Sequence, residues 1–529
     1  MPTLTWIGKE KVVNHHLDVP YKVLEHQYTY IGGGQTGEEM PDGNKIIRGD
    51  NLEALKALLP QYEGKIKSIY IDPPYNTGNE NWVYNDNVND PRIRRWLGKV
   101  VGQEGEDLSR HDKWLCMMYP RLKLLHRLLA EDGVLFISID DNEQIYLREI
   151  CNEIFGCRNF VAQIIWQKRT SPDMRKKIST GHEYVVVIAK NIENINESIN
   201  TLALGEADVA RFKNPDNDPK GPWTSTDYTA QGFRPNQMYT ITTPGGAQYT
   251  PTDGHCWKNV EEVYLEQLAE GRFWFGTDGK GMPRRKTYLS ERTGKNTWTW
   301  WPNAEVGHTQ EATQEITSLF GSKTVFDYPK PVRLVQRIVQ IATRSDSIIL
   351  DSFAGSGTTA HAVLNMNKAD GGNRKFILVE MEDYAESITA ERVRRVIDGY
   401  GEGKKAVEGT GGSFSFYDLG EPLLHEDHTL NENVSTDKIR QYIYFTETKT
   451  PMGADSAAEP YLLGKHIETA YYFYYQKERL TTLNHEFLAT VQTRAESYVM
   501  YADLCALSED ELEQYHIIFK KIPRDITRL

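Results

Sequence analysis

The sequence is poor in cysteine, in long apolar runs and in net positive charge. Its 529 residues contain five cysteines, none of them in a C-x-x-C pair, which argues against a disulfide framework and against a zinc site. No run of about 18 apolar residues occurs, and the first residues lack a basic-then-apolar signal pattern. We therefore expect a cytoplasmic protein that is neither secreted nor embedded in a membrane.

The net charge of −13 at pH 7 runs against a nucleic-acid partner, but it is unevenly distributed. Residues 401–529 carry 21 acidic and 13 basic side chains, which accounts for −8 of the total. Because charges more than about 10 Å apart are largely screened at moderate salt, local basic clusters decide whether phosphates are contacted. The acidic net charge therefore weakens the case for a nucleic-acid partner without excluding one.

Strand-like and helix-like segments alternate along two separate parts of the chain. The expected strands are 66–71, 134–139, 160–166, 184–188, 347–350 and 376–379, and the expected helices are 114–129, 143–155, 331–343 and 358–367. This alternation predicts an α/β fold with a parallel, doubly wound sheet. Between the two parts, Gly, Pro, Thr and aromatic residues dominate and periodicity is weak.

The sheet domain is therefore expected to be split by an insertion and followed by a smaller C-terminal domain. The expected parts are an irregular extension over 1–40, a first half of the core over 41–190, an insertion over 191–323, a second half over 324–400, and a C-terminal domain over 401–529. A glycine-rich hinge at 399–412 introduces the last part.

A glycine-rich turn, Phe353-x-Gly355-x-Gly357, lies between an expected strand and helix 358–367. Glycine lets the backbone turn tightly and approach a ligand, and the helix start offers unpaired N–H groups. The next strand ends at Glu380, which is placed to accept hydrogen bonds from ribose hydroxyls. The turn has one Gly fewer than the dinucleotide fingerprint and no Lys after its last Gly, which favours a single nucleoside. A plain strand–helix turn is the alternative.

A second motif, Asp72-Pro73-Pro74-Tyr75, follows the strand at 66–71. Two prolines end a strand, so Asp72 is expected at its carboxyl end. The Asp72 carboxylate and the Pro73 carbonyl can each accept one hydrogen of an amino group, and proline fixes the direction of its carbonyl. Tyr75 offers a face on which a base can stack. The alternative is a Pro-Pro turn capped by an aspartate.

These motifs resemble those of a known family. Asp72-Pro73-Pro74-Tyr75 resembles motif IV of amino-methyltransferases, Phe353-x-Gly355-x-Gly357 resembles motif I, and this order resembles the β class of DNA adenine-N6 methyltransferases. Over roughly residues 40–450 the chain resembles modification (Mod) subunits of type III restriction–modification systems. The segments that carry this are Ile47-Arg48-Gly49-Asp50-Asn51-Leu52, Tyr70 to Gly78, Tyr84-Asn85-Asp86, His182-Glu183-Tyr184, Tyr328-Pro329-Lys330-Pro331 and Tyr417-Asp418-Leu419-Gly420-Glu421-Pro422.

The resemblance implies a Rossmann-like sheet, S-adenosylmethionine as methyl donor, and N6 of a flipped-out adenine in double-stranded DNA as acceptor. It places Lys330 near the methionine carboxylate, Phe353 in the cofactor pocket and Glu380 at the ribose. The expected cofactor set is completed by Asp351, Gly355, Gly357 and Thr358. Asp50 either joins this set or caps a helix. Ser352 stands where the family usually has Pro, and serine fits a strand–loop junction.

The insertion at 191–323 is the expected target-recognition region. The candidates for DNA contact are Arg284-Arg285-Lys286 there, and Lys168-Arg169 with Arg175-Lys176-Lys177 in the first half of the core. Solvated loops are the alternative for each cluster. His182-Glu183-Tyr184 has no second ligand pair nearby and methyl transfer from a sulfonium needs no metal, so a structural role is expected for it.

The acidic C-terminal region, with tyrosines at 471, 472, 474 and 475, suits protein contact better than phosphate contact. The resemblance implies a homodimer and a restriction subunit with helicase and nuclease activity as partners. The alternatives are a solitary adenine methyltransferase with an epigenetic role, a cytosine-N4 methyltransferase, and a DNA-binding module with an inactive site. Asp72 favours adenine because the cytosine branch tends to have Ser at this position, and the intact Asp72 and Glu380 argue against an inactive site.

Overall fold

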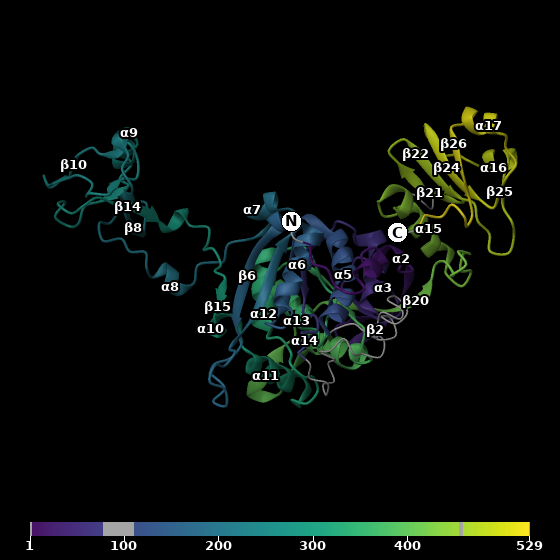
Figure 1. The fold of residues 1–529 in the computed structure, drawn as a ribbon, viewed down its shortest axis with the longest axis horizontal. Coiled ribbons are helices and arrows are strands. Elements are labelled where there is room, and N and C mark those ends of the chain that lie inside the picture. The colour runs from purple at the N-terminus through teal and green to yellow at the C-terminus, as the bar shows by residue number, and fades with distance from the viewer. Residues whose placement is uncertain (1–2, 78–109, 454–458, 528–529) are drawn as a thin grey trace. The chain divides into compact units, whose positions relative to one another are not determined.

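The computed structural model describes residues 3–77, 110–453 and 459–527 (Figure 1). The chain divides into two compact units, one combining residues 1–200 with 298–529 and the other comprising residues 201–297. Gly78 and Tyr84-Asn85-Asp86, which contribute to the resemblance, lie outside the described residues. Within the described ranges, no helix has the length and apolar character needed to span a bilayer.

The first unit is built on one sheet, which has eleven strands among the described residues in the order β15-β6-β7-β5-β4-β16-β17-β3-β20-β1-β2. The strands are β1 Lys22–Ile31, β2 Gly34–Thr36, β3 Lys45–Arg48, β4 Ile66–Ile71, β5 Leu129–Ile139, β6 Phe160–Gln167, β7 His182–Ala189, β15 Trp300–Trp301, β16 Ile348–Asp351, β17 Lys375–Glu380 and β20 Ser413–Pro422. From β5 to β20 all neighbours are parallel. The expected doubly wound, Rossmann-like α/β sheet is confirmed.

The expectation of a parallel sheet does not hold for every pair of neighbouring strands. β7 runs antiparallel to both β5 and β6, and β1 runs antiparallel to both β20 and β2. Parallel neighbours need a crossover, usually through a helix, whereas residues 168–181 lead from β6 to β7 without one. The chain therefore returns alongside β6 in the opposite direction.

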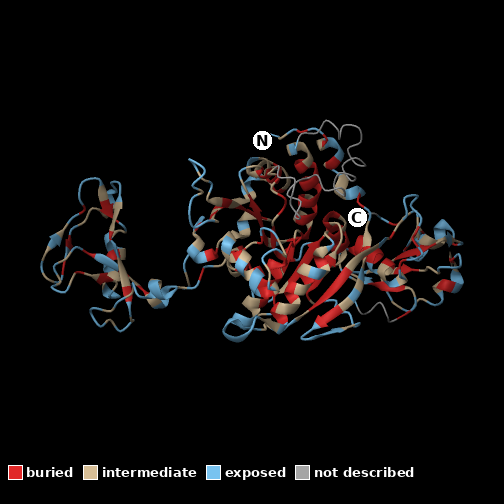
Figure 2. Ribbon diagram, turned by 90° about the horizontal axis from the view of Figure 1, so that it is seen from below, coloured by how far each residue is buried: buried red, intermediate tan, exposed pale blue. Residues whose placement is uncertain are grey.

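The central strands are buried on both faces, as parallel sheets require. All six residues of β4 are buried, which explains why this segment reads as a nearly continuous β-prone run. Figure 2 shows the buried residues concentrated in the strands and the helices that cover them. Burial on both faces leaves the strand ends as the places where polar chemistry can be presented.

Helices cover both faces of the sheet. They are α3 Asn51–Tyr62, α5 Arg110–Leu128 and α6 Gln144–Phe155 on one face, and α12 Val332–Ala342, α13 Thr358–Asp370 and α14 Glu391–Asp398 on the other. The crossovers through α3 and α5 advance toward β5, whereas those through α13 and α14 advance toward β20. Because crossovers are right-handed, opposite directions place the helices on opposite faces.

The direction of winding reverses between the neighbouring strands β4 and β16. The chain leaves β4 toward α5 and leaves β16 toward α13, on opposite faces of the sheet. Such a switch point opens a crevice at the carboxyl ends of the two strands. Both sequence motifs follow these two strands directly, so the fold brings them to one place.

Both ends of the chain contribute more to the main sheet than the sequence indicated. Residues 1–40 were expected to be irregular, yet β1 pairs with β20 from Lys22 to Ile31. β20, expected within the C-terminal domain, pairs in parallel with β3. The strand at 22–31 escaped prediction because its burial alternates irregularly and its partner lies far along the chain.

The remaining C-terminal residues form a second, smaller sheet. Helix α15 Thr436–Thr448 packs into the main core, and the sheet comprises β21 Leu462–His466, β22 Thr469–Phe473, β24 Ser497–Ala502 and β26 Ile517–Lys521. Tyr472 is only 1% exposed and belongs to this sheet's core. The tyrosines at 471, 474 and 475 are half-buried: Tyr474 packs against this core, whereas Tyr471 and Tyr475 pack against the main core.

The second unit has its own aromatic core and short strands. Its elements include β8 Trp223–Asp227, β9 Thr229–Gln231, β10 Ile241–Thr242, β11 Gln248–Tyr249, β12 His255–Trp257, α9 Glu261–Ala269, β13 Phe273–Trp274 and β14 Arg284–Tyr288. Tyr228, Trp257 and Tyr264 pack at its centre. This unit is shorter than the insertion expected at 191–323, because β15 joins the edge of the main sheet beside β6 and α11 Thr309–Phe320 lies in the first unit.

Candidate active site

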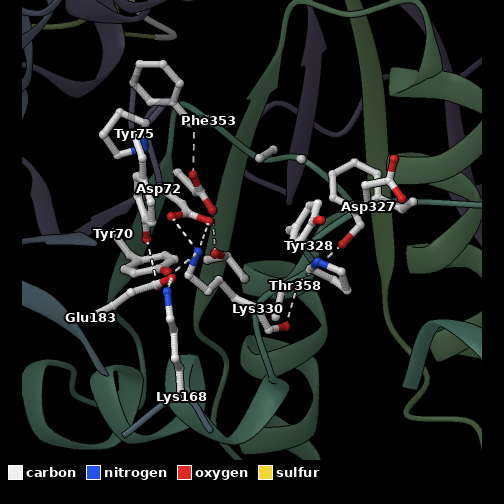
Figure 3. A pocket seen from close by; sticks show the side chains of 18 of the residues that line it. Tyr70, Asp72, Tyr75, Lys168, Glu183, Asp327, Tyr328, Lys330, Phe353 and Thr358 are labelled. Atoms are coloured by element: carbon white, nitrogen blue, oxygen red, sulfur yellow. Dashed lines mark hydrogen bonds and ion pairs between the residues drawn. The ribbon is translucent and has the colours of Figure 1, made fainter. Parts of the chain in front are cut away.

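A cavity of about 380 Å³ lies at the carboxyl ends of β4 and β16 (Figure 3). Its lining residues come from β4 and the turn after it (Tyr70, Asp72, Pro73, Tyr75, Thr77), from around β5 to β7 (Asp140, Lys168, Arg169, Glu183), from the segment before α12 (Phe326, Asp327, Tyr328, Pro329, Lys330), and from β16 and its glycine turn (Asp351, Phe353, Ala354, Gly355, Ser356, Thr358, Thr359). The volume is within the range of about 300–1,000 Å³ that is usual for small-molecule sites. The two sequence motifs therefore face one cavity.

Asp72 forms a close ion pair in this cavity. The Lys330 ammonium donates to both carboxylate oxygens of Asp72, at 2.8 and 2.7 Å. Burial raises the pKa of Asp72, and the charge of Lys330 opposes that rise. The resemblance implies that Lys330 lies near the cofactor's carboxylate; in the structure its ammonium faces Asp72, with Glu183 at 3.7 Å.

Tyr75 belongs to the same network, on one side of the cavity (Figure 3). Its hydroxyl donates to Glu183 at 3.0 Å, and the Lys330 ammonium lies 4.9 Å from the centre of its ring. Lys168 donates to the other oxygen of Glu183 at 2.8 Å. Burial would raise the pKa of Glu183, but the neighbouring ammonium groups of Lys330 and Lys168 outweigh it, so the pKa lies below its usual range.

Glu183 is a site residue that sequence reasoning assigned to structure alone. It lies near the start of β7, which runs antiparallel to its neighbours β5 and β6. Only this reversal brings the first residues of β7 to the edge where β4 ends. The sequence does show a pair of polar residues before an apolar strand, which could have marked a site residue. It did not indicate that this strand runs antiparallel to its neighbours.

The turn that carries Asp72 is held from behind by side chains on neighbouring elements. The indole N–H of Trp114 donates to the Pro74 carbonyl at 2.7 Å. Asn76 adopts a left-handed backbone conformation with φ of 59°, and its amide donates to Glu143 at 2.5 Å. Pro74 is buried and does not line the cavity, so its part is to shape the turn rather than to contact a ligand.

On the other side of the cavity, two buried carboxyl groups flank the glycine turn. Asp351 accepts a hydrogen bond from Thr359 at 2.5 Å and from the Phe353 N–H at 3.0 Å. Glu380 accepts from the Gly355 N–H at 2.7 Å. Burial raises the pKa of Asp351 to about 7 and that of Glu380 to about 8. Among the described residues, no cation near either carboxyl group offsets this burial.

The glycine turn is shaped by its own residues and by a buried arginine. Gly357 has φ of 83°, and a Cβ there would lie 3.1 Å from the Thr389 carbonyl oxygen. Arg392, which sequence reasoning missed, is fully buried and donates to Ser356 at 2.7 Å and to Thr358 at 2.9 Å. The sequence contains little indication of this role, because an arginine on a helix 35 residues after the turn is normally expected to be exposed to solvent.

Some expected cofactor residues lie beside the cavity rather than on its wall. Glu380 supports the glycine turn from behind, and Gly357 ends that turn, but neither residue lines the cavity. Asp50 caps α3 by accepting from the N–H groups of Leu52 at 2.8 Å and Glu53 at 3.2 Å, which matches the capping alternative. Its neighbour Asn51 donates to the Ser352 carbonyl at 3.0 Å, so this motif supports the turn.

The expected DNA-contacting residues differ in their surroundings. Lys168 and Arg169 line the cavity, and Arg169 belongs to the loop that leaves β6. Arg284 and Arg285 are both exposed, and Arg284 is paired with Asp227. Lys286, also expected to contact DNA, is buried between Asp216 and Asp218, at 2.5 and 2.6 Å, so its charge is neutralised inside its own unit.

Comparison with known proteins places this chain among DNA-modifying relatives. The family model for N6 and N4 methyltransferases, described as DNA methylase, matches residues 66–391. The chain is 36% identical over 357 residues to the type III restriction–modification enzyme StyLTI Mod subunit of Salmonella typhimurium, covering 64% of this chain and 52% of that protein. It is 33% identical over 423 residues to the EcoPI Mod subunit of Escherichia phage P1, covering 72% and 64%.

A third relative is named as a type II rather than a type III enzyme. The chain is 32% identical over 366 residues to the type II methyltransferase M.KpnI of Klebsiella pneumoniae, covering 64% of this chain and 80% of that protein. The chain spans 52% and 64% of the lengths of the two Mod subunits it matches. The family model spans both motifs and more than half of the chain, and the chain therefore belongs to the DNA methylase family of N6 and N4 methyltransferases.

Proposed function

We propose that this protein transfers a methyl group from S-adenosylmethionine to the N6 amino group of adenine in double-stranded DNA. The observation that carries the proposal is the meeting of Asp72 and Pro73 with the Asp351-to-Gly355 turn in one cavity. Family membership and the similarity to Mod subunits support it. We further propose that the chain acts in the cytoplasm as the modification and specificity subunit of a type III system, as a homodimer with a restriction subunit as partner.

The cavity fits S-adenosylmethionine by charge and by shape. Its lining contains five carboxylates, Asp72, Asp140, Glu183, Asp327 and Asp351, against three cations, Lys168, Arg169 and Lys330. This surplus suits a ligand with a sulfonium charge. The first residues of α13 also line the cavity, and the start of a helix attracts a carboxylate. Phe353 supplies an apolar wall for a nucleoside base, and Glu380 lies directly behind the turn.

S-adenosylmethionine supplies an electrophilic methyl group on its sulfonium sulfur. The chain's own task is to make the amino nitrogen of adenine a better nucleophile, because its lone pair is delocalised into the ring. Asp72 and the Pro73 carbonyl accept the two amino hydrogens and favour a tetrahedral nitrogen with an available lone pair. Both acceptors are fixed before the base arrives, which is the condition for electrostatic stabilisation to be effective.

Lys330 can stabilise the Asp72 carboxylate without preventing it from accepting an amino hydrogen. A carboxylate offers about four lone-pair positions, so Asp72 can keep both bonds to Lys330 and still accept from an amino group. The ammonium stabilises the ionised carboxylate, which is the form that accepts. Glu183 in turn holds both Lys330 and the Tyr75 hydroxyl, and so orients the ring on which the base would stack.

We assign target recognition to the unit at 201–297, whose separate core lets it vary without disturbing the catalytic sheet. Arg285 is its exposed candidate for DNA contact. Exchanging residues 201–297 for those of a relative with another target should change the methylated sequence. Retention of the original target would place recognition elsewhere in the chain.

Methylation itself is tested by expressing the chain in a bacterial host that lacks adenine methylation and sequencing the DNA on a single-molecule platform. We expect N6-methyladenine in one sequence context with the wild type and none with Asp72→Ala. The Asp72→Ala variant should still bind S-adenosylmethionine in calorimetry. Methylated cytosine would favour the N4 alternative, and a wild type that binds no S-adenosylmethionine would overturn the proposal in favour of an inactive DNA-binding module.

A further inference from the structure

The loop at residues 168–181, which joins β6 to β7, presents two apolar side chains to solvent at its tip. Met174 and Ile178 are each 92% exposed, more than any other large apolar side chain in the described part of the chain. Figure 1 shows this loop projecting from the end of β6, away from the sheet. Leaving two such side chains in water is unfavourable, so their exposure calls for a binding partner.

The loop holds this conformation through its own polar contacts. Its base is closed by hydrogen bonds from the N–H groups of Lys168 and Arg169 to the Gly181 carbonyl, at 2.9 and 3.3 Å. Nearer the tip, the Asp173 N–H donates to Ser179 at 2.8 Å. The Arg175 guanidinium donates to both carboxylate oxygens of Asp173 at 2.9 Å. These contacts hold the loop in one conformation, in which Asp173 and Ser179 are half-buried and the two apolar side chains are exposed.

The surroundings of the two apolar side chains are strongly basic. Residues 168–181 contain five cations and one carboxylate, in a chain whose net charge is −13. Arg175, Lys176 and Lys177 lie between Met174 and Ile178 in the sequence and are all exposed. Cations beside apolar tips suit a partner that has an anionic exterior and an apolar interior. Duplex DNA, with its phosphates and stacked bases, has this character.

The position of the loop beside the cavity favours DNA as the partner. Lys168 and Arg169, at the base of the loop, line the cavity that contains Asp72. The same two residues also line two neighbouring hollows, one with Lys176 and Ser179 and the other with Asp173 and Arg175. The loop therefore borders the opening through which a target base would enter the cavity.

We propose that this loop is a wedge that enters the DNA when the target adenine leaves the helix. Met174 and Ile178 fill the space between base pairs that the flipped adenine vacates, and Arg175, Lys176 and Lys177 contact the flanking phosphates. The wedge replaces part of the stacking that the departing base gives up, and thereby stabilises the extrahelical base. The proposal rests on the proposed function, because only a base that must leave the duplex creates such a space.

The test compares Met174→Ser/Ile178→Ser with the wild type on a duplex that contains the target found by sequencing. A matched control, Ile467→Ser/Leu480→Ser, removes two exposed apolar side chains, 80% and 74% exposed, from the C-terminal domain. We expect the loop variant to methylate the paired duplex at least about tenfold more slowly, while its affinity for the duplex changes by less than about threefold because phosphate contacts persist. The control should match the wild type.

A second substrate distinguishes loss of the wedge from general damage to the active site in the loop variant. When the target adenine faces an abasic position, flipping is less costly, so the loop variant should regain most of the wild-type rate. Arg175→Ala/Lys176→Ala/Lys177→Ala should lower the slope of log affinity against log salt by about 0.9 for each phosphate that the variant no longer neutralises. Equal rates of the loop variant and the wild type on the paired duplex, or no recovery on the abasic duplex, would overturn the wedge.

Failure of the proposed function gives a different result, because the wild type itself would then methylate neither duplex. An anionic membrane is the other partner with a charged exterior and an apolar interior. Vesicles that contain phosphatidylserine provide the probe for it. Sedimentation of the wild type with these vesicles, abolished in Met174→Ser/Ile178→Ser while methylation is unchanged, would overturn the DNA wedge in favour of a membrane contact.

Discussion

Replacing Lys330 with methionine removes the cation that faces Asp72 and retains an unbranched side chain of similar length. In the structure, the Lys330 ammonium lies 2.8 and 2.7 Å from the two oxygens of Asp72. Burial raises the pKa of Asp72, and Lys330 is the main group that opposes it. Without the ammonium, Asp72 holds its proton to higher pH and loses part of its capacity to accept from an amino group.

The size of the effect follows from the burial of the pair. The Lys330 side chain is 10% exposed and that of Asp72 is 21% exposed. Removing one partner of a buried ion pair costs about 3–5 kcal/mol, and the remaining exposure of Asp72 places this pair near the lower limit. Because the transition state requires the ionised Asp72, a cost of about 3 kcal/mol on that charged form lowers the rate about a hundredfold.

The assay is kcat at saturating DNA and S-adenosylmethionine, measured from about pH 6 to about pH 9, because it reports the groups that titrate in the bound complex. The activity of Lys330→Met should rise at higher pH than that of the wild type, so the difference between them narrows as the pH increases. Lys330→Arg, which keeps the charge, should retain the wild-type profile.

Lys168→Met is the matched control, because Lys168 contacts Glu183 rather than Asp72. It should leave the low-pH limb of the profile in place. An unchanged kcat and an unshifted low-pH limb in Lys330→Met would refute the role assigned to this ion pair. A faster Lys330→Met enzyme would refute it as well, since that result would mean that the ammonium competes with the base for Asp72.

Three further predictions concern the surroundings of the pair. Glu183→Gln should lower kcat about tenfold by loosening Lys330 and Tyr75, without changing the affinity for S-adenosylmethionine in calorimetry; weaker cofactor binding with full kcat would contradict it. Gly357→Ala should lower the free energy of unfolding by about 1–2 kcal/mol in urea titrations, because the left-handed backbone disfavours a side chain; equal stability would show that the turn relaxes. Because burial raises the pKa of Glu380 to about 8, a cofactor that requires its ionised form should bind with proton release and more tightly as the pH rises through that value. Calorimetry in buffers of different ionisation enthalpy measures this release, and an equal release in Glu380→Gln would assign it to the cofactor's own amino group.

Local sequence patterns were sufficient for the elements that carry the two motifs. The strand expected at 66–71 coincides with β4, and the helix expected from 358 begins at Thr358. Such elements depend on the alternation of apolar residues, on proline and glycine, and on capping groups, all of which act between near neighbours. The two motifs could be assigned to one site because each follows a strand, and the carboxyl ends of parallel strands meet at one edge.

The partners within the site could not be derived in this way. Lys330 lies 258 residues from Asp72, and Glu183 lies 108 residues from Tyr75. The local sequence around a lysine before a helix, or around a glutamate before a strand, does not indicate which distant residue it contacts. The reversed direction of β7 and the burial of Arg392 and Lys286 likewise depend on packing between distant segments.

The sequence by itself predicted the chemistry proposed for this protein, because Asp72-Pro73-Pro74-Tyr75 and the glycine turn are short motifs whose expected function depends on residue type and order. Only the tertiary structure decided how that chemistry is supported. It paired Asp72 with Lys330, joined Glu183 to Tyr75, and placed the Met174 and Ile178 loop beside the cavity. The physical reason is that charges and buried polar groups are controlled by what lies within a few ångströms in space, and the fold alone sets those neighbours.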